Sequence, residues 1–284
     1  MEAEMNATAR PADSRIVMIG RAGAPRGAVG FGGRTRIIAP VLGADREALD
    51  AEMRLLAGSE GAAVDIVEWR VDPLLAALPA GADAAAEIAR AWEQAVCLSP
   101  LPVLATIRTI DEGGEASLDA VEYAELVGLL ARLTDAVDIE IDRAGAKDLI
   151  AGARAAGAIV VASHHDFSAT APSEAVFGVL SRMDAAGADV LKIACRAREA
   201  QDALRLLDVQ LRARVVFSRP IIAIGMGGAG ALTRIAGSRF GSAATFASLG
   251  APSAPGQLSV EETRGVLDLL ERGREQSVGL FPEP

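Results

Sequence analysis

Short apolar runs recur along the chain from residue 36 onward, and longer amphipathic segments separate them. Uninterrupted apolar runs bounded by turn residues are typical of buried parallel strands, whereas helices show apolar residues at spacings of three and four. The eight strand-length runs span residues 36–42, 64–71, 102–107, 136–141, 158–162, 189–194, 220–225 and 242–247. This alternation predicts repeated strand–helix units.

The segments between the runs have the periodicity of helices. Leu49, Met53 and Leu56 follow one another at helical spacing within residues 45–57. Helices are also predicted over residues 83–96, around residues 176–183, and after residue 259. The expected helix ends are the N-caps Asp45, Asp83, Ser173 and Ser259, the last with Glu262 in a capping box, and the stops Gly157 and Gly187.

Eight strand-like runs, each followed by a helical segment, predict an α/β protein with a (β/α)₈ TIM barrel, and a doubly wound open sheet is the alternative. Two short apolar pieces precede the first run and flank a Gly- and Pro-rich turn, which predicts a hairpin-like extension over residues 15–35. Residues 1–14 have no apolar pattern and are expected to be a disordered lead. Residues 15–284 are expected to form a single barrel domain, extension included.

Composition narrows the class of protein. The chain is 51% hydrophobic but only 4% aromatic, so its core is built from Ala, Val, Leu and Ile. A net charge of −10 argues against nucleic acid as a partner, and no apolar run approaches the roughly 20 residues that span a membrane. No signal peptide is visible, and the two cysteines show neither metal-ligand spacing nor a disulfide framework. A cytoplasmic, reduced protein is expected.

Polar residues collect at the carboxyl ends of the apolar runs. In a barrel these ends meet in one mouth, where the active sites of this fold lie. The residues are Glu68, Arg70, Arg108, Glu112, Glu140, Asp142, His164, His165, Asp166, Lys192, Met226, Thr245 and Phe246. Their convergence from most of the strands favours a binding or catalytic site over ordinary surface solvation.

Lys192 lies in the middle of an apolar run and is one of only two lysines among 28 basic residues. Arginine stays protonated at any accessible pH, whereas a desolvated lysine amine can lose its proton and attack a carbonyl group. The alternative is a lysine at a strand end whose amine reaches solvent. The sequence alone leaves both interpretations open.

His164 and His165 are the only histidines in the chain. Neighbouring strand residues point to opposite faces, so one imidazole is expected near Lys192 and the other outside the site. We interpret His165 as an acid/base group and His164 as a solvated or core-capping side chain. Adjacent imidazoles do not chelate one ion in the usual geometry, so no metal is expected.

A Gly-rich segment at residues 225–230 matches the GxGxxG pattern of dinucleotide-binding turns. No acidic residue ends a following strand, so a turn that lets the backbone approach a ligand is the better interpretation. Arg234 follows this segment on a predicted helix. It is either an anion-binding residue or an ordinary surface arginine.

Several motifs together resemble the type I 3-dehydroquinate dehydratase family, in the family's order and over roughly residues 34–272. They are VDIVEWRVD at 64–72, PVLATIRTIDEGGE at 102–115, HDF at 165–167, DVLKI at 189–193, RIAGSRFGSAATF at 234–246 and APGQL at 254–258. The resemblance implies a (β/α)₈ barrel, often a homodimer. It also implies dehydration of 3-dehydroquinate to 3-dehydroshikimate, in the shikimate pathway of aromatic amino acid biosynthesis, with no metal or cofactor.

The resemblance also implies residue roles. Lys192 occupies the imine-forming position, His165 the general acid/base position, and Glu112 the position of the carboxylate that assists it. Arg234 matches the residue that pairs with the substrate carboxylate. Further substrate contacts are implied for Glu68, Arg70, Arg108, Ser253 and Gln257, with Met226 and Phe246 as pocket walls. Residues 251–257 resemble the family's mobile lid.

The chain departs from the family's pattern at residues 195–199, at residues 226–230 and at the doubled His164–His165. Two alternatives stay open. Another lysine-imine barrel, such as a class I aldolase, also needs a lysine late in the barrel. A non-catalytic relative that binds a metabolite would need neither Lys192 nor His165.

Overall fold

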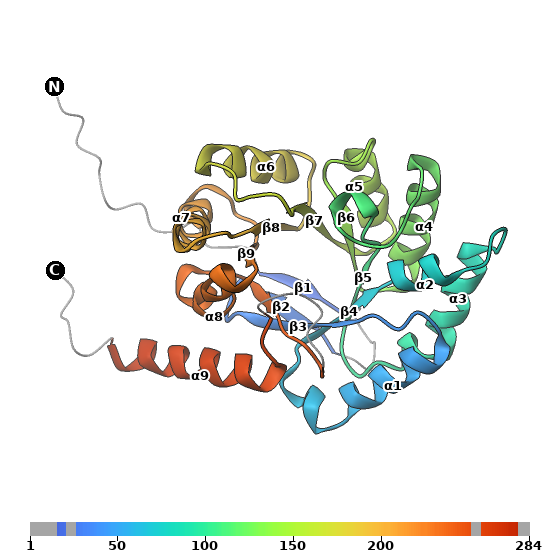
Figure 1. Ribbon diagram of the computed structural model, residues 1–284, viewed down its shortest axis with the longest axis horizontal. Coiled ribbons are helices and arrows are strands. Elements are labelled where there is room, and N and C mark those ends of the chain that lie inside the picture. The colour runs from blue at the N-terminus through green and yellow to red at the C-terminus, as the bar shows by residue number, and fades with distance from the viewer. Residues whose placement is uncertain (1–15, 21–26, 251–256, 278–284) are drawn as a thin grey trace.

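The computed structural model describes residues 16–20, 27–250 and 257–277, and Figure 1 shows strands surrounded by helices. The strands form one parallel sheet in the order β10-β3-β4-β5-β6-β7-β8-β9. The sheet closes where the Ala243 N–H donates to the carbonyl of Ile221, at 2.8 Å, between its two ends. The strands are β3 Arg36–Val41, β4 Ile66–Arg70, β5 Val103–Thr106, β6 Ala136–Glu140, β7 Ile159–Asp166, β8 Val190–Arg196, β9 Ile221–Met226 and β10 Ala244–Phe246.

Helices cover the outside of this sheet. They are α1 Arg46–Ala57, α2 Asp72–Ala77, α3 Ala84–Gln94, α4 Ala120–Leu133, α5 Ala146–Ala155, α6 Ser173–Ala185, α7 Ala200–Val216, α8 Ala231–Phe240 and α9 Val260–Ser277, with the 3₁₀ turns η1 Ser59–Ala63, η2 Val96–Leu98, η3 Ile110–Glu112 and η4 Gly228–Gly230. The predicted (β/α)₈ TIM barrel is confirmed, and the open doubly wound sheet is excluded by the closed strand order. No helix in the described ranges is long and apolar enough to span a membrane.

Most predicted helix ends are confirmed. Asp45 and Asp83 accept hydrogen bonds from the backbone N–H groups three residues later, and Ser259 forms the capping box with Glu262. Gly157 and Gly187 follow the last residues of α5 and α6 with φ of 91° and 86°, which glycine adopts without strain.

Several boundaries differ from the sequence-based expectation, most of them by one or two residues, and two differences have a clear physical reason. Ser173 is not an N-cap but the first residue of α6, because the extended backbone of Pro172 directly precedes the helix. Strand β7 does not end at residue 162 but continues to Asp166, since its polar end pairs with β8 through the register His165 with Ala194. The parallel neighbour, rather than local hydrophobicity, fixes the length of this strand.

Alternation along the strands separates two apolar environments. One set of side chains faces the helices and forms the larger core, which includes Trp69 and Ile139. The other set points into the barrel, where its first layer is apolar. This inner layer comprises Ile38, Ile66, Leu104, Ala136, Val161, Val190, Ile222 and Ala244.

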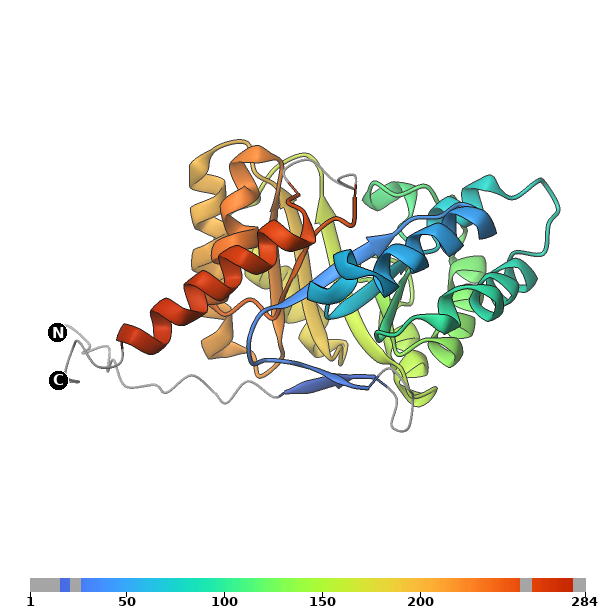
Figure 2. The ribbon, with the colours of Figure 1, turned by 90° about the horizontal axis from the view of Figure 1, so that it is seen from below.

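A two-stranded hairpin closes the N-terminal end of the barrel, as Figure 2 shows. Its strands, β1 Val17–Ile19 and β2 Val29–Phe31, pair antiparallel. Ile19 and Phe31 are fully buried against the apolar layer inside the barrel. The predicted hairpin is therefore confirmed, while the predicted disordered lead, residues 1–14, lies outside the described residues.

Candidate active site

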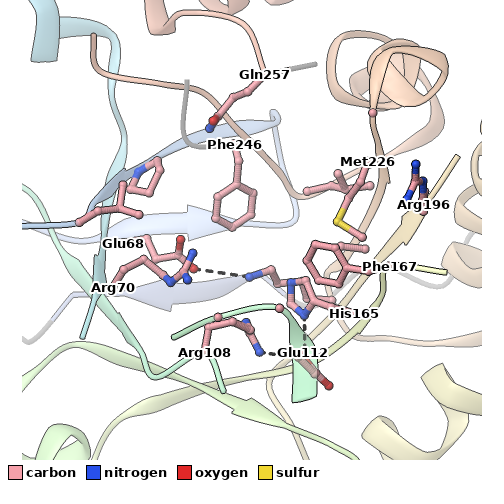
Figure 3. Close-up of a pocket in the computed structure, with 18 of the residues that line it drawn as sticks. Glu68, Arg70, Arg108, Glu112, His165, Phe167, Arg196, Met226, Phe246 and Gln257 are labelled. Atoms are coloured by element: carbon pink, nitrogen blue, oxygen red, sulfur yellow. Dashed lines mark hydrogen bonds and ion pairs between the residues drawn. The ribbon is translucent and has the colours of Figure 1, made fainter. Parts of the chain in front are cut away.

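A cavity of about 480 Å³ opens at the C-terminal end of the barrel strands. Ten of the eleven residues to which the resemblance gives a role line it, and Figure 3 shows how most of them converge. They are Glu68, Arg70, Arg108, Glu112, His165, Lys192, Met226, Arg234, Phe246 and Gln257. The eleventh, Ser253, lies with the rest of residues 251–256 outside the described part of the chain. Glu140, Asp142, His164, Asp166 and Thr245, also expected at the strand ends, do not line the cavity.

Lys192 projects from β8 into the cavity and is 4% exposed, so its amine does not reach bulk solvent. Its Nζ lies 3.1 Å from Asp138 Oδ2 and 3.5 Å from Glu68 Oε1. The same nitrogen lies 4.6 Å from the centre of the Phe246 ring. The interpretation of Lys192 as a lysine that reaches solvent is therefore wrong, and a buried amine faces the pocket.

His165 and Glu112 form a pair beside this amine. His165 Nδ1 lies 2.8 Å from Glu112 Oε2, which leaves Nε2 as the ring nitrogen available for proton transfer in the pocket. Glu112 ends the turn η3, and Gly113 follows it with φ of 77°. A side chain at Gly114 would collide with the Arg108 carbonyl, its Cβ only 2.1 Å from the oxygen. The two glycines therefore let this loop hold Glu112 against His165.

Burial and nearby charges shift the pKa values of both Glu112 and His165. Burial raises the pKa of Glu112 to about 8, although the Arg108 guanidinium opposes the change. Burial, together with the cations Arg108 and Lys192, holds the pKa of His165 well below its usual value. A neutral imidazole is the form that accepts a proton, so His165 is prepared to act as a base.

Arg108 occupies the centre of a buried charge network. Its guanidinium donates to Glu112, Asp138 and Glu140 at 2.8–3.0 Å and to Ser163 Oγ at 3.1 Å. Buried charges are stable only when they are paired and hydrogen-bonded, as these are. Arg108 thus fixes the carboxylates around Lys192 and His165.

Arg70 is also neutralised by a carboxylate. Its guanidinium forms two hydrogen bonds to Asp72, of 2.7 and 2.6 Å, in the paired geometry that arginine and carboxylate favour. Asp72 is fully buried and also accepts from the backbone N–H groups of Arg108 and Glu115. The Arg70 side chain is therefore held rigidly at the edge of the cavity.

Arg234 differs from both of these arginines. It is 5% exposed on α8, lines the cavity, and forms no ion pair with any residue in the described ranges. Its Nε is buried without a hydrogen-bond partner there, and burial lowers the pKa of Arg234 to about 10. The interpretation as a surface arginine is wrong. A buried guanidinium without a counter-charge is suited to bind an anion that enters the cavity.

A family model described as "Type I 3-dehydroquinase" matches residues 37–274. The chain belongs to the type I 3-dehydroquinase family. The 3-dehydroquinate dehydratase of Klebsiella pneumoniae is 39% identical over 243 residues, which cover 84% of this chain and 94% of the relative. That of Listeria monocytogenes is 39% identical over 254 residues, covering 86% and 96%.

Solved structures agree with this assignment. The type I 3-dehydroquinate dehydratase of Clostridium difficile, solved with covalently modified comenic acid, superposes with a TM-score of 0.81 at 31% identity. The match covers 92% of this chain and 100% of that one. This chain is thus a hydro-lyase that dehydrates 3-dehydroquinate in the shikimate pathway.

The structure adds residues to the dehydroquinase site that the sequence analysis missed. Asp138, a fully buried residue of β6, contacts Lys192, Arg108 and Ser163. Burial alone would raise the pKa of Asp138, but the charges of Arg108 and Lys192 hold it at about 2. The available signal was a charged residue inside an apolar run, the same signal that drew attention to Lys192. Phe167 and Arg196 also line the cavity.

The Gly-rich segment takes part in the site as backbone. Gly225 and Gly230 approach so closely that a Cβ on Gly230 would lie 2.3 Å from the carbonyl carbon of Gly225. Gly227, with φ of 87°, lines the cavity beside Met226. Close packing of the turn and approach of its backbone to the pocket explain these glycines without a dinucleotide.

His164 lies outside the cavity lining, on the opposite face of β7 from His165. Its Nδ1 is 2.6 Å from Asp142 Oδ2, and Asp142 Oδ1 accepts from Arg182 at 2.7 Å. The predicted separation of the two histidines is therefore confirmed. His164 is a partly exposed, hydrogen-bonded side chain.

Proposed function

We propose that the dehydroquinase converts 3-dehydroquinate to 3-dehydroshikimate through an imine on Lys192, with His165 moving the protons. One observation carries the proposal: a buried amine, a His–Glu pair and a buried guanidinium that no described residue neutralises face the same cavity. Covalent modification in the Clostridium difficile relative supports covalent chemistry in this family.

The first step forms the imine. His165 removes one proton from the Lys192 ammonium group, and the freed Nζ attacks the ketone carbon of the substrate. His165 then returns that proton to the former carbonyl oxygen, which leaves as water and so leaves a protonated C=N bond. Asp138 and Glu68 lie 3.1 and 3.5 Å from this nitrogen, so their negative charges stabilise the iminium cation. The iminium withdraws electrons from the neighbouring carbon and acidifies its C–H bond.

The second step eliminates water. His165 Nε2 takes the proton from the acidified carbon, and the electron pair of that C–H bond moves into an enamine. The imidazolium formed at His165 is stabilised by Glu112, which lies 2.8 Å from its other nitrogen. The enamine then expels the hydroxyl group, which leaves as water with the proton that His165 returns. Hydrolysis of the iminium releases the product and restores Lys192.

Substrate orientation is assigned to the remaining lining residues. Arg234 pairs with the substrate carboxylate, because it is the buried cation whose charge no described residue balances. Glu68, Arg70, Arg108 and Gln257 are proposed as polar contacts. Ser253 is a further proposed polar contact, and Met226 and Phe246 are proposed as the apolar walls. Bidentate pairing at one end of the substrate fixes the position of its ketone relative to Lys192.

A substrate panel tests the proposal against a class I aldolase and against a metabolite-binding protein. We expect turnover of 3-dehydroquinate, followed through the ultraviolet absorbance of the conjugated product, and no cleavage of aldol substrates. If 3-dehydroquinate stabilised the fold but were not turned over, the protein would instead be a non-catalytic metabolite-binding relative. The homodimer, the cytoplasmic location and the single-domain organisation remain proposals from the resemblance and the sequence pattern.

A further inference from the structure

A second group of ligating side chains lies next to the catalytic pair. Glu112, Asp142 and His164 each offer one ligand atom, and these three atoms lie within 4.8 Å of one another. Asp142 and His164 do not line the substrate cavity, and both are partly open to solvent. An ion can therefore reach this group without passing through the cavity.

Glu112 supplies the independent observation that points to a ligand. Its Oε2 is engaged by both Arg108 and His165. Its Oε1 is buried and has no hydrogen-bond partner among the described residues, although Glu112 as a whole is only 6% exposed. A buried acceptor without a donor is costly, and a bound cation removes that cost.

We propose that Glu112 Oε1, Asp142 Oδ2 and His164 Nδ1 form a site for a divalent cation of the Zn²⁺ type. One imidazole nitrogen and two carboxylate oxygens are a ligand set that such ions accept, with water completing the coordination. The neighbouring cations keep their contacts, because Arg182 binds Asp142 through Oδ1 and Arg108 binds Glu112 through Oε2. The ion displaces the proton shared in the 2.6 Å contact between His164 and Asp142, and these two donor atoms move apart to roughly 3.3 Å, the separation of ligands on one tetrahedral ion.

The proposed site also accounts for the presence of His164 next to His165. Two adjacent imidazoles on a strand cannot chelate one ion, since they point to opposite faces. His165 faces the cavity, whereas His164 turns to Asp142 beyond the end of β6. The site therefore needs one histidine only, and the carboxylates of two other loops complete it.

Occupancy of the site would inhibit the enzyme, an effect that rests on the proposed function. A divalent ion on Oε1 withdraws electron density from the Glu112 carboxyl group and so weakens its support of the imidazolium that forms at His165 during elimination. The ion does not enter the cavity, so substrate binding is left unchanged. We expect a lower kcat at an unaltered KM.

Titration of metal-free protein with cobalt(II) chloride tests whether the site binds a metal ion, independently of enzymatic activity. We expect visible d–d absorption that saturates at a single equivalent per chain and disappears when Zn²⁺ is added. His164→Asn and Asp142→Asn should each weaken Co²⁺ binding by at least about tenfold. Asp111→Asn is the matched control, because Asp111 lies one residue from Glu112, is largely exposed, and pairs with Arg143 instead.

Thermal unfolding confirms that each variant is folded before it is titrated. Absence of saturable absorption in the wild type overturns the proposal, as does binding that neither substitution weakens. In the kinetic arm, saturating Zn²⁺ should lower wild-type kcat by at least about tenfold, reversibly with a chelator, and His164→Asn should escape this loss. Binding without any effect on kcat overturns the inhibition. A protein that binds Co²⁺ but turns over no 3-dehydroquinate contradicts the proposed function and not the site.

Discussion

The two ends of the barrel interior are built from the same strands but have opposite chemistry. At the N-terminal end, inward residues such as Ile66 and Val190 pack with the hairpin residue Phe31 in a fully apolar layer. Two positions further along the same strands, the inward residues are Glu68 and Lys192, both buried and charged. The period of two along a strand lets one end stabilise the fold while the other carries the chemistry.

The two ends also differ in how their buried charged side chains are paired. Near the hairpin, Asp65 binds Arg36 and Arg264 and the backbone N–H of Ile37, so its charge is fully compensated. In the catalytic cavity, Arg234 is buried without any described counter-charge. On the proposed assignment, an anionic group of the substrate supplies the counter-charge and offsets the cost of this burial. Four substitutions test this difference between the two ends of the barrel.

His165→Gln should have the largest effect. Removal of the acid/base group is expected to lower kcat by roughly 10²- to 10⁴-fold, with little change in the free energy of unfolding, because only proton transfer is lost. Steady-state kinetics and urea unfolding measure the two effects. His164→Gln, assayed without metal, is the control and should retain kcat. Equal losses in both variants would contradict the assignment.

Phe31→Ala should have the opposite profile. The fully buried ring fills the N-terminal end of the barrel, so its loss is expected to lower the free energy of unfolding by about 3–5 kcal/mol. The folded fraction should keep its kcat, because the cavity lies at the other end. Met18→Ala, on the outer side of the same hairpin, is the control, with an expected change within about 0.5 kcal/mol. A lower kcat in folded Phe31→Ala would contradict the separation between a stabilising end and a catalytic end of the barrel.

Arg234→Gln should separate binding from stability. Loss of the carboxylate partner is expected to raise KM by about 30-fold or more, equivalent to about 2 kcal/mol. The free energy of unfolding should stay the same or rise, because a buried charge without a partner disappears. Arg239→Gln, exposed on the same helix, is the control. Destabilisation by Arg234→Gln would show that the guanidinium has a structural partner.

Asp65→Asn should have the smallest effect and depend on pH. Burial opposes ionisation of Asp65, but the hydrogen bond from Ile37 and the charges of Arg264 and Arg36 outweigh it and lower the pKa of Asp65 below 3.8. A lowered pKa stabilises the fold above the unfolded-state value, and the stabilisation is lost as the pH falls through the folded-state value.

Urea unfolding at neutral pH should therefore show a loss of about 1 kcal/mol in the Asn variant. The difference from wild type should shrink below pH 3.8. Asp148→Asn, on the exposed start of α5, serves as the reference. A loss that is independent of pH would mean that shape, and not charge, determines the contribution of Asp65.

The barrel was predictable from sequence because each strand is a compact apolar run and each main helix has its own periodicity. The convergence of Lys192 and His165 followed from the geometry of parallel strand ends, whereas only the family resemblance implied that Arg234, on a helix, belongs to the site. Local patterns could not show that β7 continues to Asp166, since a neighbouring strand determines that length. Pro172 likewise overrides the capping preference of Ser173.

The charge network was the least predictable part. Asp138 lies in an apolar run, and its partners Arg108 and Ser163 are 30 and 25 residues away in the sequence. That no described carboxylate pairs with Arg234 is likewise a property of the folded chain, because the sequence does not show which side chains lie close together. The sequence supplied the candidate reacting groups, while the structure distinguished the compensated Arg70 and Arg108 from Arg234, which has no counter-charge among the described residues.

The central claim is that Lys192 forms the imine, and reductive trapping tests it most directly. Wild-type protein and Lys192→Ala are incubated with 3-dehydroquinate and borohydride, and their intact masses are measured. We predict a covalent adduct on the wild type and none on the variant, with His165→Gln trapping the substrate more slowly because it keeps the amine but not the proton shuttle. A folded wild type that forms no adduct, or an adduct that persists in Lys192→Ala, would contradict the account.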